Sequence, residues 1–238
     1  MSQIKVTVTM PAYNVANYVE DAIESVLAQD FDAFELIIID DGSSDGTCDR
    51  LACYTGHPRV RLAHHTSNQG SGFTRNRILE LARGEYLLPC DADDLLLPGA
   101  LQKLSQFLDN NDEFGVVYGD ILRLETAANT LQDPPSIVGV DANNVWDLFE
   151  NAVNHGGSMM RTDLVRQVGG YAVGSAPDDW GLFLKLAEIT KIHYLKGFIY
   201  YVWRLNDGSQ SRSPANFKAT HLLIEAAIDR RAKRQSQP

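Results

Sequence analysis

The first 120 residues alternate between short apolar runs and longer segments in which apolar side chains recur at helical spacing. Residues 35–40, ELIIID, form a nearly continuous apolar run, which is typical of a parallel strand buried on both faces. The same patterns predict strands at 4–10, 35–40, 60–64, 86–90 and 116–120, and helices at 17–29, 47–54, 72–83 and 98–110. Strands and helices that alternate in this way predict an α/β fold, with a mostly parallel central sheet flanked by helices.

The second half of the chain is less regular. Residues 126–144 include Pro134-Pro135 and several Asn and Asp residues, which favours a long loop. Further helices are predicted at 145–151, 162–168, 179–188 and 214–234, and strands at 192–195 and 199–203. We therefore expect a single domain, residues 1–238, made of a regular half (1–120), an irregular half (121–213) and a C-terminal helix (214–238).

Polar side chains gather where the predicted strands of the first half end. They are Tyr13 and Asn14, Asp40 and Asp41, Asn68, and the group from Asp91 to Asp94. On a parallel sheet the carboxyl ends of the strands form the edge where ligands bind. We expect Pro11 to end the first strand and these side chains to lie close together, so this edge is the candidate site.

Three carboxylates, Asp91, Asp93 and Asp94, stand between two apolar segments in LLPCDADDLLLPG. Burying carboxylates this close together costs several kcal/mol unless a cation or a hydrogen-bond donor is nearby. A divalent ion would neutralise them and bridge them to a diphosphate. The alternative is that Asp93 or Asp94 caps the helix that starts near Pro98.

Charge and cysteine content limit the partners and the compartment. The formal net charge is −10, which argues against nucleic-acid binding, because that requires a basic surface. The three cysteines form neither a CxxC motif nor a zinc-binding pattern, which favours a reduced, cytoplasmic setting. No apolar run approaches the roughly 18 residues that a membrane-spanning helix requires. The N-terminus is predicted to be a strand and not a signal peptide.

Two loops offer weaker signals. IDDGSSDGT, residues 39–47, fits the start of an EF-hand, but the twelfth position is Ala52 where calcium needs a bidentate Glu. A nucleotide contact and a plain turn with a helix cap remain open for this loop. NQGSGFTRN, residues 68–76, places glycines at a helix start and Arg75 just after them, which suits a phosphate. It is neither a P-loop nor a GxGxxG motif.

Taken together, the first 110 residues resemble the family 2 glycosyltransferases, which have the GT-A fold. The resemblance rests on the order and spacing of PAYNVANYVEDAIESVLAQ, ELIIIDDGSSDGT, NQGSGFTRNRILELARGEYLLPCDADD and LLLPGAL. RTDLVRQVGGYA, PDDWGLFLKLA and YYVWRLNDGSQS extend it more loosely into the second half. It implies that residues 1–120 bind a nucleotide sugar and that residues 121–213 bind the acceptor.

The resemblance also implies a donor site. Asp41 would accept a hydrogen bond from the base, often uracil, and Arg75 would approach the base or the diphosphate. Asp91-Ala92-Asp93 resembles the family's Asp-x-Asp motif, in which Asp93 would bind Mn²⁺ or Mg²⁺ and Asp91 would contact the ribose or the sugar. Asp94 would be an outer ligand or a helix cap. The remaining residues that would line the nucleotide are Pro11, Ala12, Tyr13, Asn14, Asn68 and Gly70.

A general base is the other requirement of the implied reaction. The acceptor hydroxyl attacks the anomeric carbon, and its proton must pass to a group within hydrogen-bond reach. The family places this base in an acidic pair before a helix, and Asp178-Asp179 in PDDW matches it, with Trp180 next to it. Asp179 is the implied base and inversion the implied outcome. Capping of the following helix is the alternative.

Three segments of the second half leave alternatives open. Gly169-Gly170-Tyr171 resembles the family's turn before the acidic pair, and it also suits a helix C-cap. His155 lies in HGGS, where sugar contacts are often found, although a lone histidine is more often structural. The late segment lacks the histidine that closes the site over the metal in some members, which puts metal affinity or loop closure in doubt. Part of its role would fall to Trp203, Arg204 or Asp207, and Arg204 could instead pair with the diphosphate.

The sequence thus favours a metal-dependent, inverting glycosyltransferase. Its donor would be a nucleotide sugar, with UDP favoured, and its acceptor a glycan, a lipid-linked molecule or a small molecule. One alternative is a catalytically silent subunit that only binds nucleotide sugar or glycan, against which the intact Asp91, Asp93 and Asp179 argue. A nucleotidyltransferase ranks last, because PAYN at 11–14 lacks the Gly-rich loop with Arg and Lys that such enzymes use.

The predicted C-terminal helix ends in a basic group, Arg230 to Arg234. This group could contact an anionic membrane surface or a partner, as a peripheral protein would at the inner face of a membrane. It could equally complement the helix dipole and stay in water, which we favour.

Overall fold

The computed structural model describes residues 3–126, 130–132, 141–143, 147–148, 153, 155–174 and 178–205. The predicted C-terminal helix, its basic end and Asp207 lie outside these residues. So do most of the predicted loop at 126–144 and most of the predicted helix at 145–151. None of the described helices is both long and apolar enough to cross a membrane.

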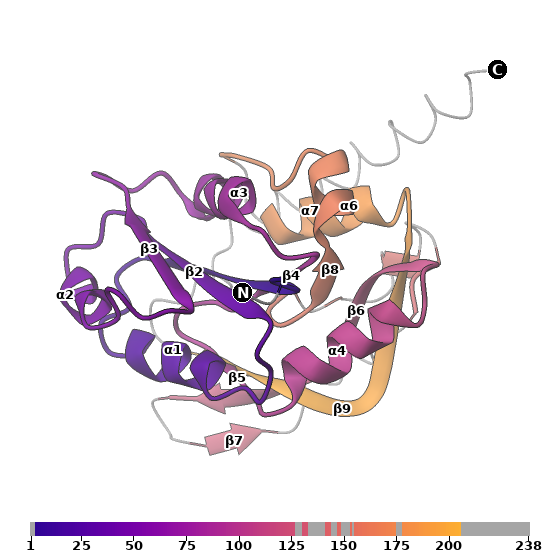
Figure 1. Ribbon diagram of the computed structural model, residues 1–238, viewed down its shortest axis with the longest axis horizontal. Helices are drawn as coiled ribbons and strands as arrows, with labels where there is room; N and C mark the ends of the chain where they lie inside the picture. The colour runs from indigo at the N-terminus through magenta and orange to yellow at the C-terminus, as the bar shows by residue number, and fades with distance from the viewer. Residues whose placement is uncertain are drawn as a thin grey trace.

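A single curled sheet forms the centre of the molecule (Figure 1). Its strands lie in the order β3-β2-β1-β4-β8-β6-β9-β5, and β7 pairs with β6. β1 to β4 are parallel neighbours, β6 and β9 are also parallel, and β8 runs antiparallel between β4 and β6. The strands are β1 (Val6–Ala12), β2 (Phe34–Asp40), β3 (Val60–His64), β4 (Tyr86–Pro89), β5 (Leu95–Leu96), β6 (Phe114–Glu125), β7 (Thr130–Gln132), β8 (Met159–Arg161) and β9 (Lys191–Leu205). The predicted mostly parallel central sheet is confirmed.

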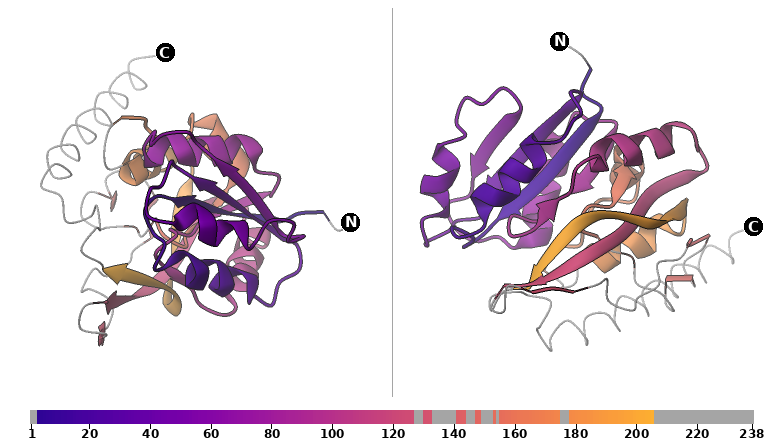
Figure 2. Two further views of the ribbon diagram at one scale, coloured as in Figure 1. Left: turned by 90° about the vertical axis from the view of Figure 1, so that its left-hand side faces the viewer. Right: turned by 90° about the horizontal axis from the view of Figure 1, so that it is seen from below.

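Helices cover both faces of this sheet (Figures 1 and 2). They are α1 (Val19–Leu27), α2 (Thr47–Ala52), α3 (Ser71–Leu81), α4 (Ala100–Asp109), α6 (Thr162–Gln167) and α7 (Asp178–Leu186). α1 and α4 lie on one face, and α3, α6 and α7 lie on the other.

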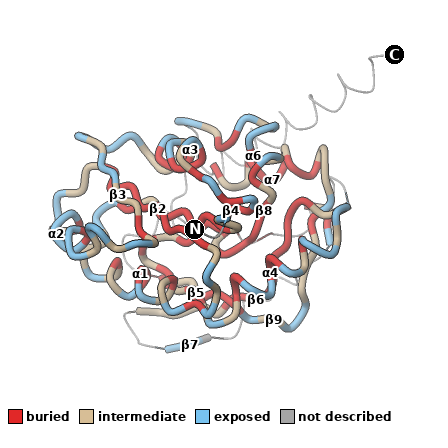
Figure 3. The backbone as a smooth tube through the Cα atoms, in the orientation of Figure 1, coloured by how far each residue is buried: buried red, intermediate tan, exposed pale blue. Residues whose placement is uncertain are grey.

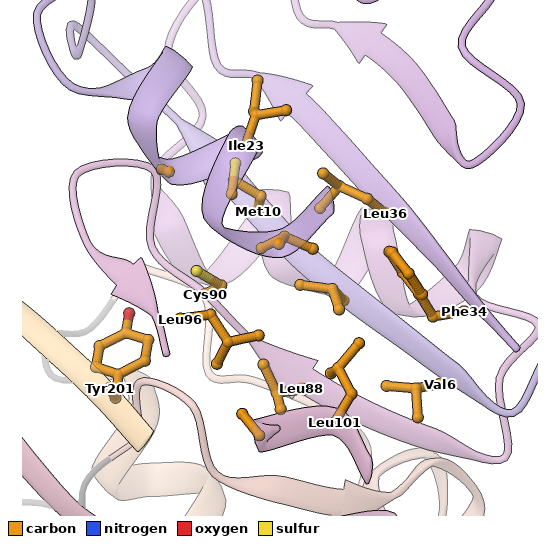
Figure 4. Close-up of a cluster of buried hydrophobic side chains, with 14 of the residues drawn as sticks. Val6, Met10, Ile23, Phe34, Leu36, Leu88, Cys90, Leu96, Leu101 and Tyr201 are labelled. Carbon is orange, nitrogen blue, oxygen red and sulfur yellow. The ribbon is translucent and has the colours of Figure 1, made fainter. Parts of the chain in front are cut away.

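The continuous apolar run of β2 is explained by burial on both faces. Leu36 and Ile38 point into the cluster that α1 and α4 cover, part of which Figure 4 shows. Ile37 and Ile39 point the other way and pack against Ile78 of α3. The buried backbone therefore concentrates in the central strands, as Figure 3 shows.

Two strands differ from the prediction. β1 continues through Pro11 to Ala12, because β4 ends opposite Thr9 and the missing amide of proline breaks no bond on that side. β9 is one strand where two were predicted. Residues 196–198 form a bulge in it, since Leu195 pairs with Gly119 and Ile199 with the next residue, Asp120.

The strand order creates the predicted ligand-binding edge. The chain moves from β1 outward to β2 and β3, then returns to the other side of β1 for β4. The direction of the connections thus reverses between β1 and β4, and the carboxyl ends of these two strands mark the switch point near which α/β sheets bind ligands.

Candidate functional site

Asp41 anchors the loop between β3 and α3 to the end of β2. Its carboxylate is buried and accepts hydrogen bonds from the backbone amides of Gln69 (2.9 Å) and Gly70 (2.8 Å). The same carboxylate lies 2.7 Å from Nδ1 of His65. Asn68 reaches the Gly70 amide as well, at 2.9 Å from its Oδ1. The structure therefore brings Asp41, Asn68 and Gly70 together in one wall, as predicted for the donor site.

Asn14 joins the loops that follow β1 and β2. Its φ of 52° lies in the left-handed region, which asparagine tolerates better than most residues. Its side-chain Oδ1 accepts a hydrogen bond from the backbone amide of Ser44, and its backbone amide donates one to Oγ of Ser43, both at 2.9 Å. Tyr13, just before it, is 44% exposed, so its ring is accessible just after the carboxyl end of β1.

The sequence left two interpretations open for the loop at 39–47, a nucleotide contact and a plain turn with a helix cap. Different residues of the loop fit different interpretations. Asp45 accepts hydrogen bonds from the amide and hydroxyl of Thr47, the first residue of α2, and from the amide of Ala16. The interpretation as a turn and helix anchor therefore explains Asp45. It does not explain Asp41, whose carboxylate binds the loop between β3 and α3 instead.

Asp94, in the acidic group after β4, does not cap a helix. α4 begins at Ala100 behind Gly99, which has φ 80°, and the amide of Leu101 in its first turn donates to Oε1 of Gln29. Asp94 is buried and accepts hydrogen bonds from the hydroxyl of Tyr201 and the amide of Arg204, both at 2.8 Å. The capping interpretation is thus wrong for Asp94, whose hydrogen bonds lead to β9.

Three carboxyl groups, those of Asp91, Asp93 and Asp94, are crowded together in this turn. Burial raises the pKa of Asp94 well above its usual value, and the charges of Asp93 and Asp91 raise it further. Burial also acts to raise the pKa of Asp91, but the Arg75 guanidinium outweighs it and the pKa is lowered. The turn is therefore electrostatically suited to a cation.

The donor set fits a metal ion that protein and substrate hold jointly. No three His, Cys, Asp or Glu side chains are arranged as a metal cage in the part of the chain that the structure describes. Mg²⁺ is usually bound through one or two carboxylates together with substrate phosphates and water. A half-buried Asp93 in a turn rich in negative charge matches that pattern.

Arg75 connects the acidic turn to α7. The residue is buried, and its Nη2 donates to Asp91 at 2.8 Å while its Nη1 donates to Asp178 at 2.7 Å. The guanidinium also lies 5.7 Å from the centre of the Tyr171 ring. Burial would lower the pKa of Arg75, but the two carboxylates raise it well above its ordinary value. The arginine thus stays charged and holds the two halves of the site together.

Asp178 and Asp179 open α7, beside Arg75. Oδ1 of Asp178 lies 3.1 Å from the amide of Asp179, and Oδ1 of Asp179 accepts from the amide of Trp180 at 2.8 Å. Each of these bonds reaches only the next residue, whereas an N-cap side chain accepts from the second or third amide after it, so the capping interpretation stays open. Asp179 is half-buried, and this contact uses one of its two carboxylate oxygens. The prediction that Asp179 is the general base therefore also stays open.

The loop before α7 is docked on α3. Gly169 and Gly170 have φ of 79° and 63°, and the Gly170 amide donates to Val165 of α6. This geometry confirms the helix C-cap interpretation. Tyr171 then exchanges two hydrogen bonds of 2.8 Å with the side chain of Asn76, through its own amide and carbonyl.

The weaker candidates have structural contacts. His155 is buried, its Nε2 lies 3.0 Å from the Tyr171 hydroxyl, and burial together with Arg75 lowers its pKa. Arg204 donates to Asp21 of α1 at 3.1 Å. Trp203 and Trp180 are both half-buried. The sequence did not single out Tyr201. The one feature that could have pointed to it is its place in the Tyr200-Tyr201 pair that begins YYVWRLNDGSQS.

A family model described as "Glycosyl transferase family 2" matches residues 7–169 of this chain. The putative teichuronic acid biosynthesis glycosyltransferase TuaG of Bacillus subtilis is 38% identical over 104 residues, which cover 43% of this chain and 41% of that protein. The putative glycosyltransferase EpsE of the same organism is 32% identical over 172 residues, which cover 70% and 60%. The chain thus spans about half the length of these two relatives.

Solved structures agree with the fold. TarS 1-349 of S. aureus, in complex with UDP-GlcNAc, superimposes with a TM-score of 0.78 at 22% identity, covering 94% of this chain and 65% of that one. The mannosyltransferase PcManGT of Pyrobaculum calidifontis, in complex with GDP-Man and Mn²⁺, gives 0.72 at 21% identity, covering 94% and 64%. The predicted GT-A fold is confirmed.

Proposed function

This chain belongs to glycosyl transferase family 2, and from that membership we propose that it is an inverting glycosyltransferase. It moves a sugar from a nucleotide-sugar donor, with UDP as the expected nucleotide, to a hydroxyl group of a glycan or lipid-linked acceptor. One observation carries the proposal: Arg75 bridges Asp91, in the donor half, to Asp178, beside the proposed base. Both parts of a transfer site thereby share one crevice.

The donor nucleotide is assigned to the ends of β1 and β2. Asp41 would accept a hydrogen bond from the base, and the exposed ring of Tyr13 would cover it. TarS has been solved with UDP-GlcNAc and PcManGT with GDP-Man, so a nucleoside diphosphate sugar is the donor class that these neighbours support. A carboxylate acceptor such as Asp41 suits the N–H of uracil better than the ring nitrogen of cytosine, which is itself an acceptor.

Asp93 is the residue that would hold Mn²⁺ or Mg²⁺ together with the donor diphosphate. When bound, the ion supplies Lewis-acid neutralisation of the leaving group. PcManGT has been solved with Mn²⁺. Asp91, held by Arg75 at 2.8 Å, would face the ribose or the transferred sugar.

Asp179 is proposed to take the proton of the acceptor hydroxyl. The acceptor oxygen forms a bond to the anomeric carbon as the bond to the diphosphate breaks, so a single displacement inverts that carbon. Asp178, paired with Arg75 at 2.7 Å, fixes the start of α7 and with it the position of Asp179. A general base of this kind contributes about 10²- to 10⁴-fold to the rate.

The test compares Asp179→Asn with a matched control, Asp163→Asn. Asp163 lies in the first turn of α6 and its Oδ1 accepts from the next amide at 2.8 Å, as Oδ1 of Asp179 does in α7. We expect Asp179→Asn to lower nucleotide release from UDP-GlcNAc, UDP-glucose or GDP-mannose by about 10²-fold or more. The thermal shift with UDP and Mn²⁺ should not change, and Asp163→Asn should leave both readouts as in the wild type.

Two results would contradict the proposal. If Asp179→Asn kept its transfer rate, another group would be the base and Asp179 would only cap α7. If a wild-type chain that binds nucleotide released none from any donor with any glycan acceptor, the silent binding subunit would be the better account.

A further inference from the structure

Tyr201 of β9 lies directly beneath the acidic turn. The side chain is buried, and the residue pairs with Leu96 of β5 across the sheet. Its hydroxyl accepts a hydrogen bond from the amide of Asp91 at 3.1 Å and donates one to Oδ2 of Asp94 at 2.8 Å. Figure 4 shows its ring on β9 at the edge of the apolar cluster. One hydroxyl group therefore joins the first and last residues of the turn.

Two further bonds close the same unit. The amide of Arg204, three residues along β9, donates to Oδ1 of Asp94 at 2.8 Å. The amide of Asp94 donates to the carbonyl of Asp91 at 3.0 Å. One hydrogen bond within the turn and the bonds to Tyr201 and Arg204 of β9 thus fix its conformation. Asp93 lies between the two residues, Asp91 and Asp94, that make these bonds.

The HGGS segment holds the Tyr201 ring in place. A Cβ on Gly156 would lie 2.7 Å from ring atom Cε1 of Tyr201. One on Gly157 would lie 2.4 Å from Cε2 of Tyr200 and 2.8 Å from Cδ2 of Tyr201. The amide of Gly157 also donates to the carbonyl of Pro89, the last residue of β4, at 2.6 Å. Two glycines suit this position because the backbone passes close to the rings of Tyr200 and Tyr201, and Gly156 in particular confines the Tyr201 ring and with it the place of its hydroxyl.

We propose that Tyr201 is a positioning residue that sets the Asp91–Asp94 turn for joint binding of a divalent cation and a diphosphate through Asp93. Only a hydroxyl can accept from the Asp91 amide and donate to the Asp94 carboxylate at once. Without it, a buried carboxylate loses a donor in a turn where like charges repel each other. This inference rests on the proposed function, because it assumes that Asp93 binds the metal.

The test is UDP binding by calorimetry, in Mn²⁺ and in EDTA, for Tyr201→Phe. The variant keeps the aromatic ring against Gly156 and Gly157 and removes only the hydroxyl. We expect the gain in UDP affinity that Mn²⁺ provides to fall at least tenfold, with affinity in EDTA unchanged. Tyr200→Phe is the matched control, because Tyr200 is equally buried but its hydroxyl contacts the backbone of Gly156, at 3.4 Å from the carbonyl, and of Gly119, whereas that of Tyr201 contacts the acidic turn.

Gly156→Ala is the second variant, in case Tyr201→Phe does not fold. It retains the hydroxyl but pushes the ring aside, so it should also reduce the Mn²⁺-dependent gain. The inference is overturned if Tyr201→Phe matches the wild type in Mn²⁺, or if it loses UDP affinity equally in EDTA, as a purely structural role would produce. A wild type that gains no affinity from Mn²⁺ would instead overturn the proposed metal site itself.

Discussion

Arg75 illustrates at the scale of one residue why the guanidinium group is required in this crevice. Its two Nη atoms donate to carboxylates from different segments, Asp91 and Asp178. Lysine would keep the charge but present a compact ammonium without the fixed fork. We expect Arg75→Lys to lower the free energy of unfolding in urea by about 2 kcal/mol and to reduce the transfer rate.

Arg77→Lys is the matched control for Arg75→Lys. Arg77 lies on the same helix, but it is exposed and pairs on the surface with Glu80. Exposed pairs contribute about 0–1 kcal/mol, so this variant should unfold at nearly the wild-type urea concentration. If both variants lowered the free energy of unfolding equally, the bridge from Arg75 to Asp91 and Asp178 would stabilise the fold no more than an exposed ion pair does.

Most residues of the candidate site stand in motifs that the sequence shows, but their pairings could not be predicted from it. Asp91 and Asp178 each stand in a short recognisable motif, yet the arginine between them is separated from Asp178 by 103 positions. No local pattern encodes such a contact, because it depends on how α7 docks against α3. For the same reason Asp94 was expected to be an outer ligand or cap, whereas it binds β9 through Tyr201.

At the scale of elements, Glu35 ties β1, β2 and β3 together at the sheet edge opposite the site. Its carboxylate accepts hydrogen bonds from Thr7, Arg61 and Arg83. Burial alone would raise the pKa of Glu35, but these donors, Arg83 foremost, outweigh it and lower the pKa below the usual 4.5. The carboxylate is therefore a structural acceptor in a remote part of the fold.

Glu35→Gln should lower the free energy of unfolding by about 2 kcal/mol at pH 7, since it removes charge-assisted hydrogen bonds from a buried site. The folded pKa lies below the unfolded value, so the carboxylate's contribution is complete above pH 4.5 and is lost as the pH falls through the folded pKa. Urea unfolding from pH 7 to pH 3 should show the two proteins converging at the acid end. Glu85→Gln, at an exposed position, should follow the wild type throughout, and a difference that persisted at low pH would contradict this account.

Long elements with strong patterns were predictable, and short ones were not. β2 was found because an apolar run bounded by turn residues leaves few alternatives. β5 and β8 have two and three residues, too few to show any period, and their pairing with distant strands creates them. β9 was divided in two because Lys196 and Gly197 interrupt its pattern, and they form the bulge.

At the scale of the whole molecule, β8 joins the two halves. Its residues Met160 and Arg161 pair with Leu87 and Tyr86 of β4, and Met160 also pairs with Val116 of β6. Met160, Leu87 and Val116 belong to one buried cluster together with residues of α7. Since the halves share a sheet and a core, we expect them to unfold in one cooperative transition, as a single domain does.

The tryptophans make this expectation testable, because all three, at positions 146, 180 and 203, lie in the second half. Their fluorescence should therefore report on that half, while far-ultraviolet circular dichroism reports on both. We expect the two urea transitions to coincide and to move together when UDP and Mn²⁺ are added. At about a hundred times its dissociation constant, a ligand adds about 2.7 kcal/mol. A fluorescence transition that came first and ignored the nucleotide would mean that the two halves unfold independently, and that nucleotide bound at the ends of β1 and β2 does not stabilise the half that carries Asp179.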